Sequence, residues 1–128
     1  IQVKEIMATG KEIPLISVNR TMSAAIMEMS KKKLGIVCIK EKNGKINLIT
    51  DGDIRRNANN LYKKKILSVC KKNPIWVSDT DTALSAIEKM NGLKITSLLV
   101  CRGQDINKKI KNITGVLHIH ECLRRGIS

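Results

Sequence analysis

Two stretches of the chain carry the same pattern of apolar positions. "TMSAAIMEMSKKKLGIVCI", residues 21–39, matches "TALSAIEKMNGLKITSLLV", residues 82–100, at a constant offset of 61 residues. Apolar residues recur at i, i+3, i+4 and i+7 in both, which predicts an amphipathic helix. Each helix follows a threonine that is suited to cap it. We expect the two apolar stripes to be buried: Met22, Ala25, Ile26 and Met29 in the first, and Ala86, Ile87 and Met90 in the second.

Each predicted helix leads into two apolar strands joined by a polar turn. The strands "LGIVCI" and "INLIT" flank "KEKNGK", whose Asn-Gly pair favours a hairpin, and "ITSLLV" and "ITGVLH" flank the longer "RGQDINKKIKN". A further helix follows in each half, "DGDIRRNANNL" or "IHECLRRGI". Each half is preceded by a lead-in segment, "VKEIM" or "ILSVC", and by an extended piece, "PLISV" or "PIWVS".

The repetition predicts an α+β protein of two β-α-β-β-α repeats. One copy alone would expose a face of its sheet, so we expect the copies to pair about a pseudo-two-fold axis with their sheets in one core. The repeats are expected at 1–61 and 66–128, with a basic linker at 62–65. The opening "IQVKEIM" indicates a piece of a longer polypeptide.

The formal charge of +13 raises the question of a nucleic-acid partner. Eighteen of the 24 cationic residues are lysines, and they accompany many Asn and Ile, the residues that AT-rich codons favour. Nucleic-acid surfaces usually add arginines for paired contacts and aromatic rings for stacking. Here Phe is absent, and Trp76 and Tyr62 stand alone. The charge therefore reflects genome composition better than a nucleic-acid partner.

Cysteine spacing and hydropathy indicate a reduced, cytoplasmic protein without a membrane span. Cys38, Cys70, Cys101 and Cys122 form no CxxC pair, and their spacing fits neither a disulfide framework nor a zinc site. No apolar run approaches the roughly 18 residues that a membrane span needs. We expect no cofactor and no metal.

The stretch "ITDGDIRR", residues 49–56, has two explanations. Thr50 and Asp53 have the spacing of a capping box at the start of a helix, which is a complete structural role. The same geometry suits an anion, because Gly52 allows close backbone approach and Arg55 or Arg56 can reach a phosphate. Both explanations stay open at this point.

The order of elements and several short motifs resemble a tandem CBS-domain pair, or Bateman module. The markers are "EIM" at 5–7, "KITSLLV" at 94–100, "ITDGDIRR", and "GVLHIHECLRRG" at 115–126. The pairing of "LITDGDIRR" with "GVLHIHECLRRG" is narrower, and is similar to the C-terminal part of arabinose-5-phosphate isomerases of the KpsF/KdsD type. In that family a sugar-isomerase (SIS) domain precedes the CBS pair. The enzymes interconvert ribulose 5-phosphate and arabinose 5-phosphate on the route to Kdo, a lipopolysaccharide sugar.

The resemblance implies candidate ligand contacts. In CBS modules that bind adenosine nucleotides, the residue matching Thr50 meets phosphate and the residue matching Asp53 meets the ribose hydroxyls. The second copy departs from this pattern, because His118 and Glu121 stand at those positions. His118, His120 and Cys122 also suggest a metal, but three such residues in five at one strand–helix junction rarely converge, and the sequence offers no fourth ligand. The ligand is expected in a cleft between the copies, with Arg55 and Arg56 near phosphate.

The sequence leaves three functions open, none of them catalytic. Aldose–ketose isomerisation needs a base that moves a proton between adjacent carbons. The chain has only two histidines and lacks the phosphate loop of a SIS domain, so we expect no turnover from it. It is either a regulatory sensor of a nucleotide or nucleotide-sugar that acts on an attached SIS isomerase domain, a structural oligomerisation module that binds nothing, or, least favoured, a nucleic-acid-binding fragment. A homo-oligomer formed by CBS pairing is expected.

Overall fold

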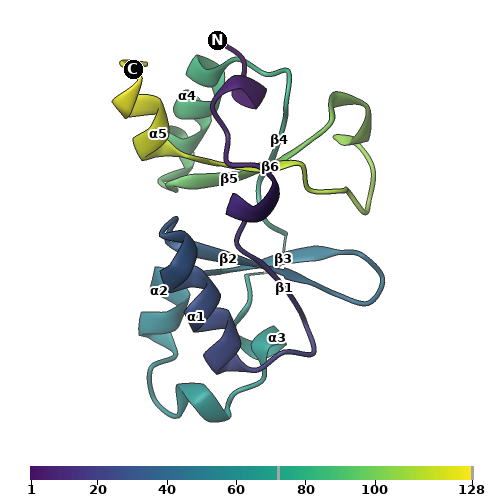
Figure 1. Cartoon of the computed structure of the whole chain (residues 1–128), viewed down its shortest axis with the longest axis vertical. Helices are drawn as coiled ribbons and strands as arrows, with labels where there is room; N and C mark the ends of the chain where they lie inside the picture. The colour runs from purple at the N-terminus through teal and green to yellow at the C-terminus, as the bar shows by residue number, and fades with distance from the viewer. Residues whose placement is uncertain (72, 128) are drawn as a thin grey trace. The chain divides into compact units, whose positions relative to one another are not determined.

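The computed structural model describes residues 1–71 and 73–127 and divides the chain into two compact units (Figure 1). The first-repeat unit is Pro14–Pro74, and the second-repeat unit combines Ile1–Ile13 with Ile75–Ser128. The chain's two prolines therefore mark the first and last residues of the first-repeat unit. These units follow packing, whereas the boundaries 1–61 and 66–128 follow sequence repetition and stay a prediction.

The first-repeat unit is a three-stranded sheet with helices. The sheet has the order β1-β2-β3, with β1 parallel and β3 antiparallel to β2. Its elements are β1 (Leu15–Ser17), α1 (Met22–Lys32), β2 (Ile36–Lys40), β3 (Ile46–Thr50), α2 (Asp51–Arg56), the 3₁₀ turn η3 (Leu61–Lys63) and α3 (Ile66–Val69). The helix expected over "DGDIRRNANNL" is shorter than predicted and ends at Arg56, because an asparagine-rich stretch of low helix propensity follows it.

The second-repeat unit repeats this architecture with the sheet order β4-β5-β6. Strand β4 is parallel to β5, and β6 is antiparallel to it. Its elements are the 3₁₀ turns η1 (Val3–Glu5) and η2 (Gly10–Glu12), β4 (Trp76–Ser78), α4 (Ala83–Leu93), β5 (Ser97–Cys101), the 3₁₀ turn η4 (Gly103–Asp105), β6 (Gly115–His118) and α5 (Ile119–Arg124). The predicted α+β class and the strand–helix order of both repeats are confirmed.

Both predicted helical stripes pack into a core. In α4, Ala86, Ile87 and Met90 are each at most 3% exposed, as expected. In α1 the buried residues are Met22, Ala25 and Met29, whereas Ile26 is only half-buried and packs at the edge of the cluster. The expectation for Ile26 was therefore wrong, because the stripe of α1 facing the sheet is narrower than the apolar stripe in the sequence.

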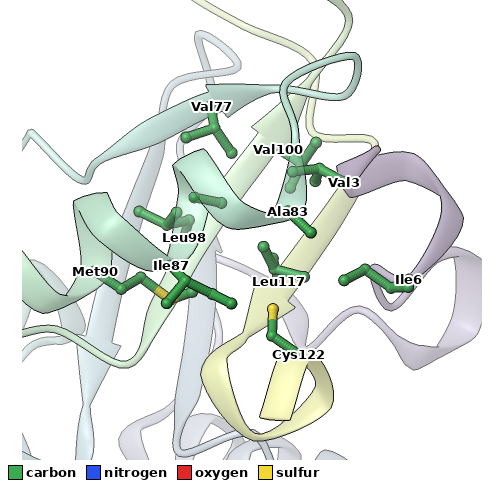
Figure 2. Packing of buried hydrophobic residues seen from close by; sticks show 11 residues of the cluster. Val3, Ile6, Val77, Ala83, Ile87, Met90, Leu98, Val100, Leu117 and Cys122 are labelled. Carbon is green, nitrogen blue, oxygen red and sulfur yellow. The ribbon is translucent and has the colours of Figure 1, made fainter. Parts of the chain in front are cut away.

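The lead-in segments are exchanged between the two cores. Val3 and Ile6, from the first lead-in segment, belong to the cluster formed by α4, α5 and the second sheet, where Figure 2 shows them near Leu117. Ile66 and Val69, from the second lead-in segment, belong to the cluster around α1. The first lead-in segment thus completes a core that is distant in the sequence, whereas the second directly follows the repeat whose core it joins.

Backbone pairing fixes the first lead-in segment in the second-repeat unit. The amides and carbonyls of Ala8 and Val116 exchange two hydrogen bonds, of 2.9 and 3.0 Å. Val3 N also donates to the carbonyl of Asp81 at 2.8 Å. In Figure 1 the purple start of the chain accordingly runs with the green and yellow segments. No helix among the described residues combines the length and the apolar character needed to cross a membrane.

Candidate functional site

The first candidate corner, residues 50–56, is a complete capping box. Thr50 ends β3 and its Oγ1 accepts a hydrogen bond from Asp53 N at 3.2 Å. In return, Asp53 Oδ2 accepts from Thr50 N at 2.9 Å and from Thr50 Oγ1 at 3.0 Å. The structural explanation of "ITDGDIRR" is therefore confirmed.

The second oxygen of the Asp53 carboxylate is also engaged. Arg56 Nη2 donates to Asp53 Oδ1 at 2.6 Å, while the Arg56 side chain remains 62% exposed. The guanidinium lies over Gly52, where an added Cβ would come within 3.1 Å of Nη1. Arg55 is also exposed. Two arginines are thus available near this corner, but Asp53 is committed to its own helix turn.

The second candidate corner, residues 118–125, is built differently. His118 caps α5 through Nδ1, which accepts from His120 N at 3.1 Å. The Glu121 carboxylate turns toward Arg124 Nη1 and Arg125 Nε, at 3.1 Å each. The reciprocal bond of the first corner is replaced by ion pairs along α5. The two repeats therefore offer different chemistry at equivalent positions.

Burial favours the neutral form of the His118 side chain. Burial lowers the pKa of His118, and the His120 ring, whose centroid lies 4.7 Å away, lowers it further. A neutral imidazole is required here, because protonation of Nδ1 would remove the acceptor that caps α5. His118 is therefore occupied as a cap.

Burial disfavours the reactive thiolate form of Cys38, Cys101 and Cys122. Burial raises the pKa of Cys38 to about 12 and also raises the pKa of Cys101 and of Cys122. A thiol attacks and binds metals as the thiolate, which these pKa values disfavour. Over residues 1–71 and 73–127, no three His, Cys, Asp or Glu side chains gather in a way that would hold a metal ion.

A cavity of about 310 Å³ lies in the first-repeat unit, away from the predicted corner. Its lining residues are Leu15, Ile16, Ser17, Lys40 and Glu41. They cluster where Ser17 of β1 pairs with Lys40 of β2, whereas Thr50 pairs with Ile36 at the other end of β2. Within this unit, the cavity and the first corner thus occupy opposite ends of the sheet.

Sequence reasoning missed this cavity. A visible signal was the pair of charged residues, Lys40 and Glu41, directly after an apolar strand, together with a serine at the end of β1. That signal is weak, because such residues are equally typical of a solvated hairpin. Only the parallel pairing of β1 and β2 brings them together.

Comparison with known proteins places this fold. Residues 66–127 match the CBS domain family. The arabinose 5-phosphate isomerase KdsD of Francisella tularensis is 33% identical over 97% of this chain, which spans 37% of that relative's length. The CBS domain pair of protein MJ0100, solved with 5′-methylthioadenosine and S-adenosyl-L-methionine, superposes with a TM-score of 0.81 at 19% identity, covering 98% of this chain and 95% of that one.

A second solved structure agrees with this fold. The CBS domain protein PAE2072 from Pyrobaculum aerophilum, complexed with AMP, also has a TM-score of 0.81. It is 22% identical, and the match covers 99% of this chain and 95% of the other. Both neighbours support the arrangement of two repeats with three-stranded sheets.

Proposed function

Because this chain is a CBS-domain pair, we propose that it is a non-catalytic regulatory module that binds an adenosine nucleotide or a nucleotide-sugar. The observation that carries the proposal is the cavity of about 310 Å³ in the first-repeat unit. Two apolar residues, Leu15 and Ile16, and three polar ones line it, a combination that can hold a small molecule and fix its orientation. Structural neighbours with this fold were solved with AMP or S-adenosyl-L-methionine.

The chain's own residues argue against catalysis. A general base needs a free lone pair within reach of the substrate. The acceptor nitrogen of His118 caps a helix, the Asp53 carboxylate is enclosed in its capping box, and Glu121 is ion-paired. The groups that resemble an acid/base set are therefore used to build helix starts.

The corner residues are the alternative location for the ligand, at the other end of the sheet from the cavity. Thr50 and Asp53 would meet phosphate and ribose, and Arg55 and Arg56 are exposed enough to meet an anion. His118 and Glu121 are the corresponding candidates in the second repeat. If this corner and not the cavity holds AMP, an Asp53→Ala variant that remains folded is expected to bind AMP about 10-fold or more weakly, because a ribose hydroxyl would lose its acceptor. Unchanged affinity would leave Asp53 as a cap alone.

The attached protein is proposed to be an isomerase. The relatives named arabinose 5-phosphate isomerase match nearly all of this chain, which spans only 37–38% of their length. The remaining part of such a protein would be a SIS domain that converts ribulose 5-phosphate to arabinose 5-phosphate for lipopolysaccharide synthesis in the cytoplasm. The module described here would adjust that activity in response to its ligand.

A thermal-shift panel tests the proposal. A ligand that binds only the folded state stabilises it by about 2.7 kcal/mol at 100 times its Kd, so AMP, ATP, S-adenosyl-L-methionine and nucleotide-sugars can be ranked by the rise in Tm. At least one is expected to raise Tm, and the chain alone is expected to show no ribulose 5-phosphate turnover. A panel without any rise, or measurable turnover, would contradict the proposal.

Self-association is a second proposal, compatible with the first. Several large apolar side chains on the helices are exposed, namely Met27 at 71%, Leu84 at 47%, Leu93 at 49% and Leu123 at 52%. Scattered exposed apolar residues are ordinary, so the proposal depends on measurement. Light scattering is expected to give a mass above the 14.3 kDa of one chain. A monomeric mass at all protein concentrations would contradict self-association.

A further inference from the structure

We infer that the module takes one ligand, in the cavity of the first repeat, and that Glu41 selects ligands that carry hydroxyl or amino donors there. The inference rests on the proposed nucleotide-binding function and adds its stoichiometry and a specificity residue. It follows from three features: the position of Glu41, the buried amide that holds it, and the different packing at the equivalent end of the second repeat.

Glu41 is the one acidic residue among the lining residues of the cavity. Leu15 and Ile16 line the same space, and Ser17 and Lys40 provide further polar groups. An ionised carboxylate only accepts hydrogen bonds. It therefore favours ligand groups that donate, such as ribose hydroxyls or an exocyclic amine, over groups that only accept.

Asn47 holds the Glu41 side chain in place. Asn47 Nδ2 donates to Glu41 Oε2 at 2.5 Å, and Asn47 is only 1% exposed, on strand β3 opposite Ile39. Its Oδ1 is buried with no hydrogen-bond partner among the described residues. A buried amide with one unpaired oxygen is costly, so its presence in a strand of apolar residues requires a reason. Fixing the carboxylate of Glu41 is a reason that the contacts support.

The equivalent end of the second repeat has different residues and a different exposure. Strand pairing matches Ser17 and Lys40 with Ser78 and Cys101, so that the next residue, Arg102, replaces Glu41. Ser17 is exposed, whereas Ser78 is 7% exposed. The second repeat thus has the cationic Arg102 where the first has the carboxylate of Glu41, and its serine, Ser78, is covered.

The longer second hairpin provides the cover. Its turn η4 places Gly103 so close that an added Cβ would lie 3.0 Å from Ser78 Oγ and 3.5 Å from Thr80 Oγ1. Ser78 Oγ already forms a hydrogen bond with the Thr80 hydroxyl, at 2.9 Å, and accepts one from the Thr80 amide, at 3.2 Å. The η4 turn therefore packs against Ser78, whereas the equivalent Ser17 of the first repeat is exposed.

Titration calorimetry with AMP as the probe tests the inference. About one AMP is expected per chain, and AMP is expected to bind more tightly than at least one of two analogues: IMP, which lacks the amino group, and 2′,3′-dideoxy-AMP, which lacks the hydroxyls. Glu41→Gln should weaken AMP binding roughly 10-fold and reduce that discrimination, because a charged acceptor is lost. The matched change in the second repeat, Arg102→Gln, should leave both unchanged.

Asn47→Leu tests the positioning role. The substitution keeps the branched shape and the number of side-chain heavy atoms but removes the amide, so discrimination between AMP and the analogues should fall as in Glu41→Gln, without a lower Tm. Two AMP per chain, or a Glu41→Gln variant with wild-type discrimination, would overturn the inference and leave the proposed function standing. A wild-type chain that binds no ligand of the panel would remove both.

Discussion

Asp53 combines a buried carboxylate with three hydrogen-bond donors from its own turn and helix. Thr50 N and Oγ1 share Oδ2, and Arg56 takes Oδ1. Asp53→Ala is expected to lower the free energy of unfolding by about 2 kcal/mol, because the cap is lost and buried donors are left unpaired. The control is Asp51→Ala on the same helix turn, where an exposed carboxylate contributes only about 0.5 kcal/mol through the helix dipole. Equal losses in urea unfolding would contradict the capping account.

His118 makes stability depend on pH. Burial and His120 lower its folded-state pKa below the ordinary value of 6.5, so the unfolded chain binds the proton more readily. This contribution to stability is present above pH 6.5 and is lost as the pH falls through the folded-state pKa. His118→Asn retains a capping oxygen but does not titrate. We expect urea unfolding to show that this variant loses less stability than the wild-type chain on acidification. Identical pH profiles for the two would contradict the role of His118.

At the scale of elements, sequence patterns predicted the features that depend on residues close to one another in the sequence, such as helix caps. The threonine caps of α1 and α4 were predicted from the sequence, because a threonine precedes each apolar stripe. The structure confirms both: Thr21 and Thr82 accept hydrogen bonds from the amides three residues on, at 3.1 Å each. The exchange of lead-in segments was not visible. "VKEIM" and "ILSVC" are similar apolar motifs, and nothing local determines which core each one completes. The cavity was missed for the same reason, since its lining comes from the pairing of β1 with β2.

Gly115 shows how tightly the first lead-in segment is held against β6. A Cβ at this position would overlap Met7 Sδ and lie 2.9 Å from the Ala8 carbonyl oxygen. Gly115→Ala is therefore expected to destabilise the fold by about 1–3 kcal/mol, as in overpacked cores. Gly92→Ala in α4 is the matched control. No heavy atom lies within 4 Å of its added Cβ, so a gain of about 0.5–1 kcal/mol is expected. Equal effects in thermal or urea unfolding would contradict this packing.

At the scale of the whole molecule, the two repeats share a fold but differ in chemistry. The first retains a polar cavity and a reciprocal capping box. The second has a histidine cap, ion pairs along its last helix, and a longer hairpin packed on Ser78. The duplication was readable from the sequence, because helical periodicity survives substitution. The functional difference that we propose between the copies depends on how one hairpin packs, which residue patterns do not specify.

The most direct test of the central claim, ligand binding by the first repeat, is an amide NMR titration of the isotope-labelled chain with AMP. The account predicts shift changes that saturate together at Ser17, Lys40 and Glu41, with no comparable change at Ser78 or Gly103. A spectrum that stays unchanged at millimolar AMP, or changes centred on Ser78 and Gly103, would contradict it.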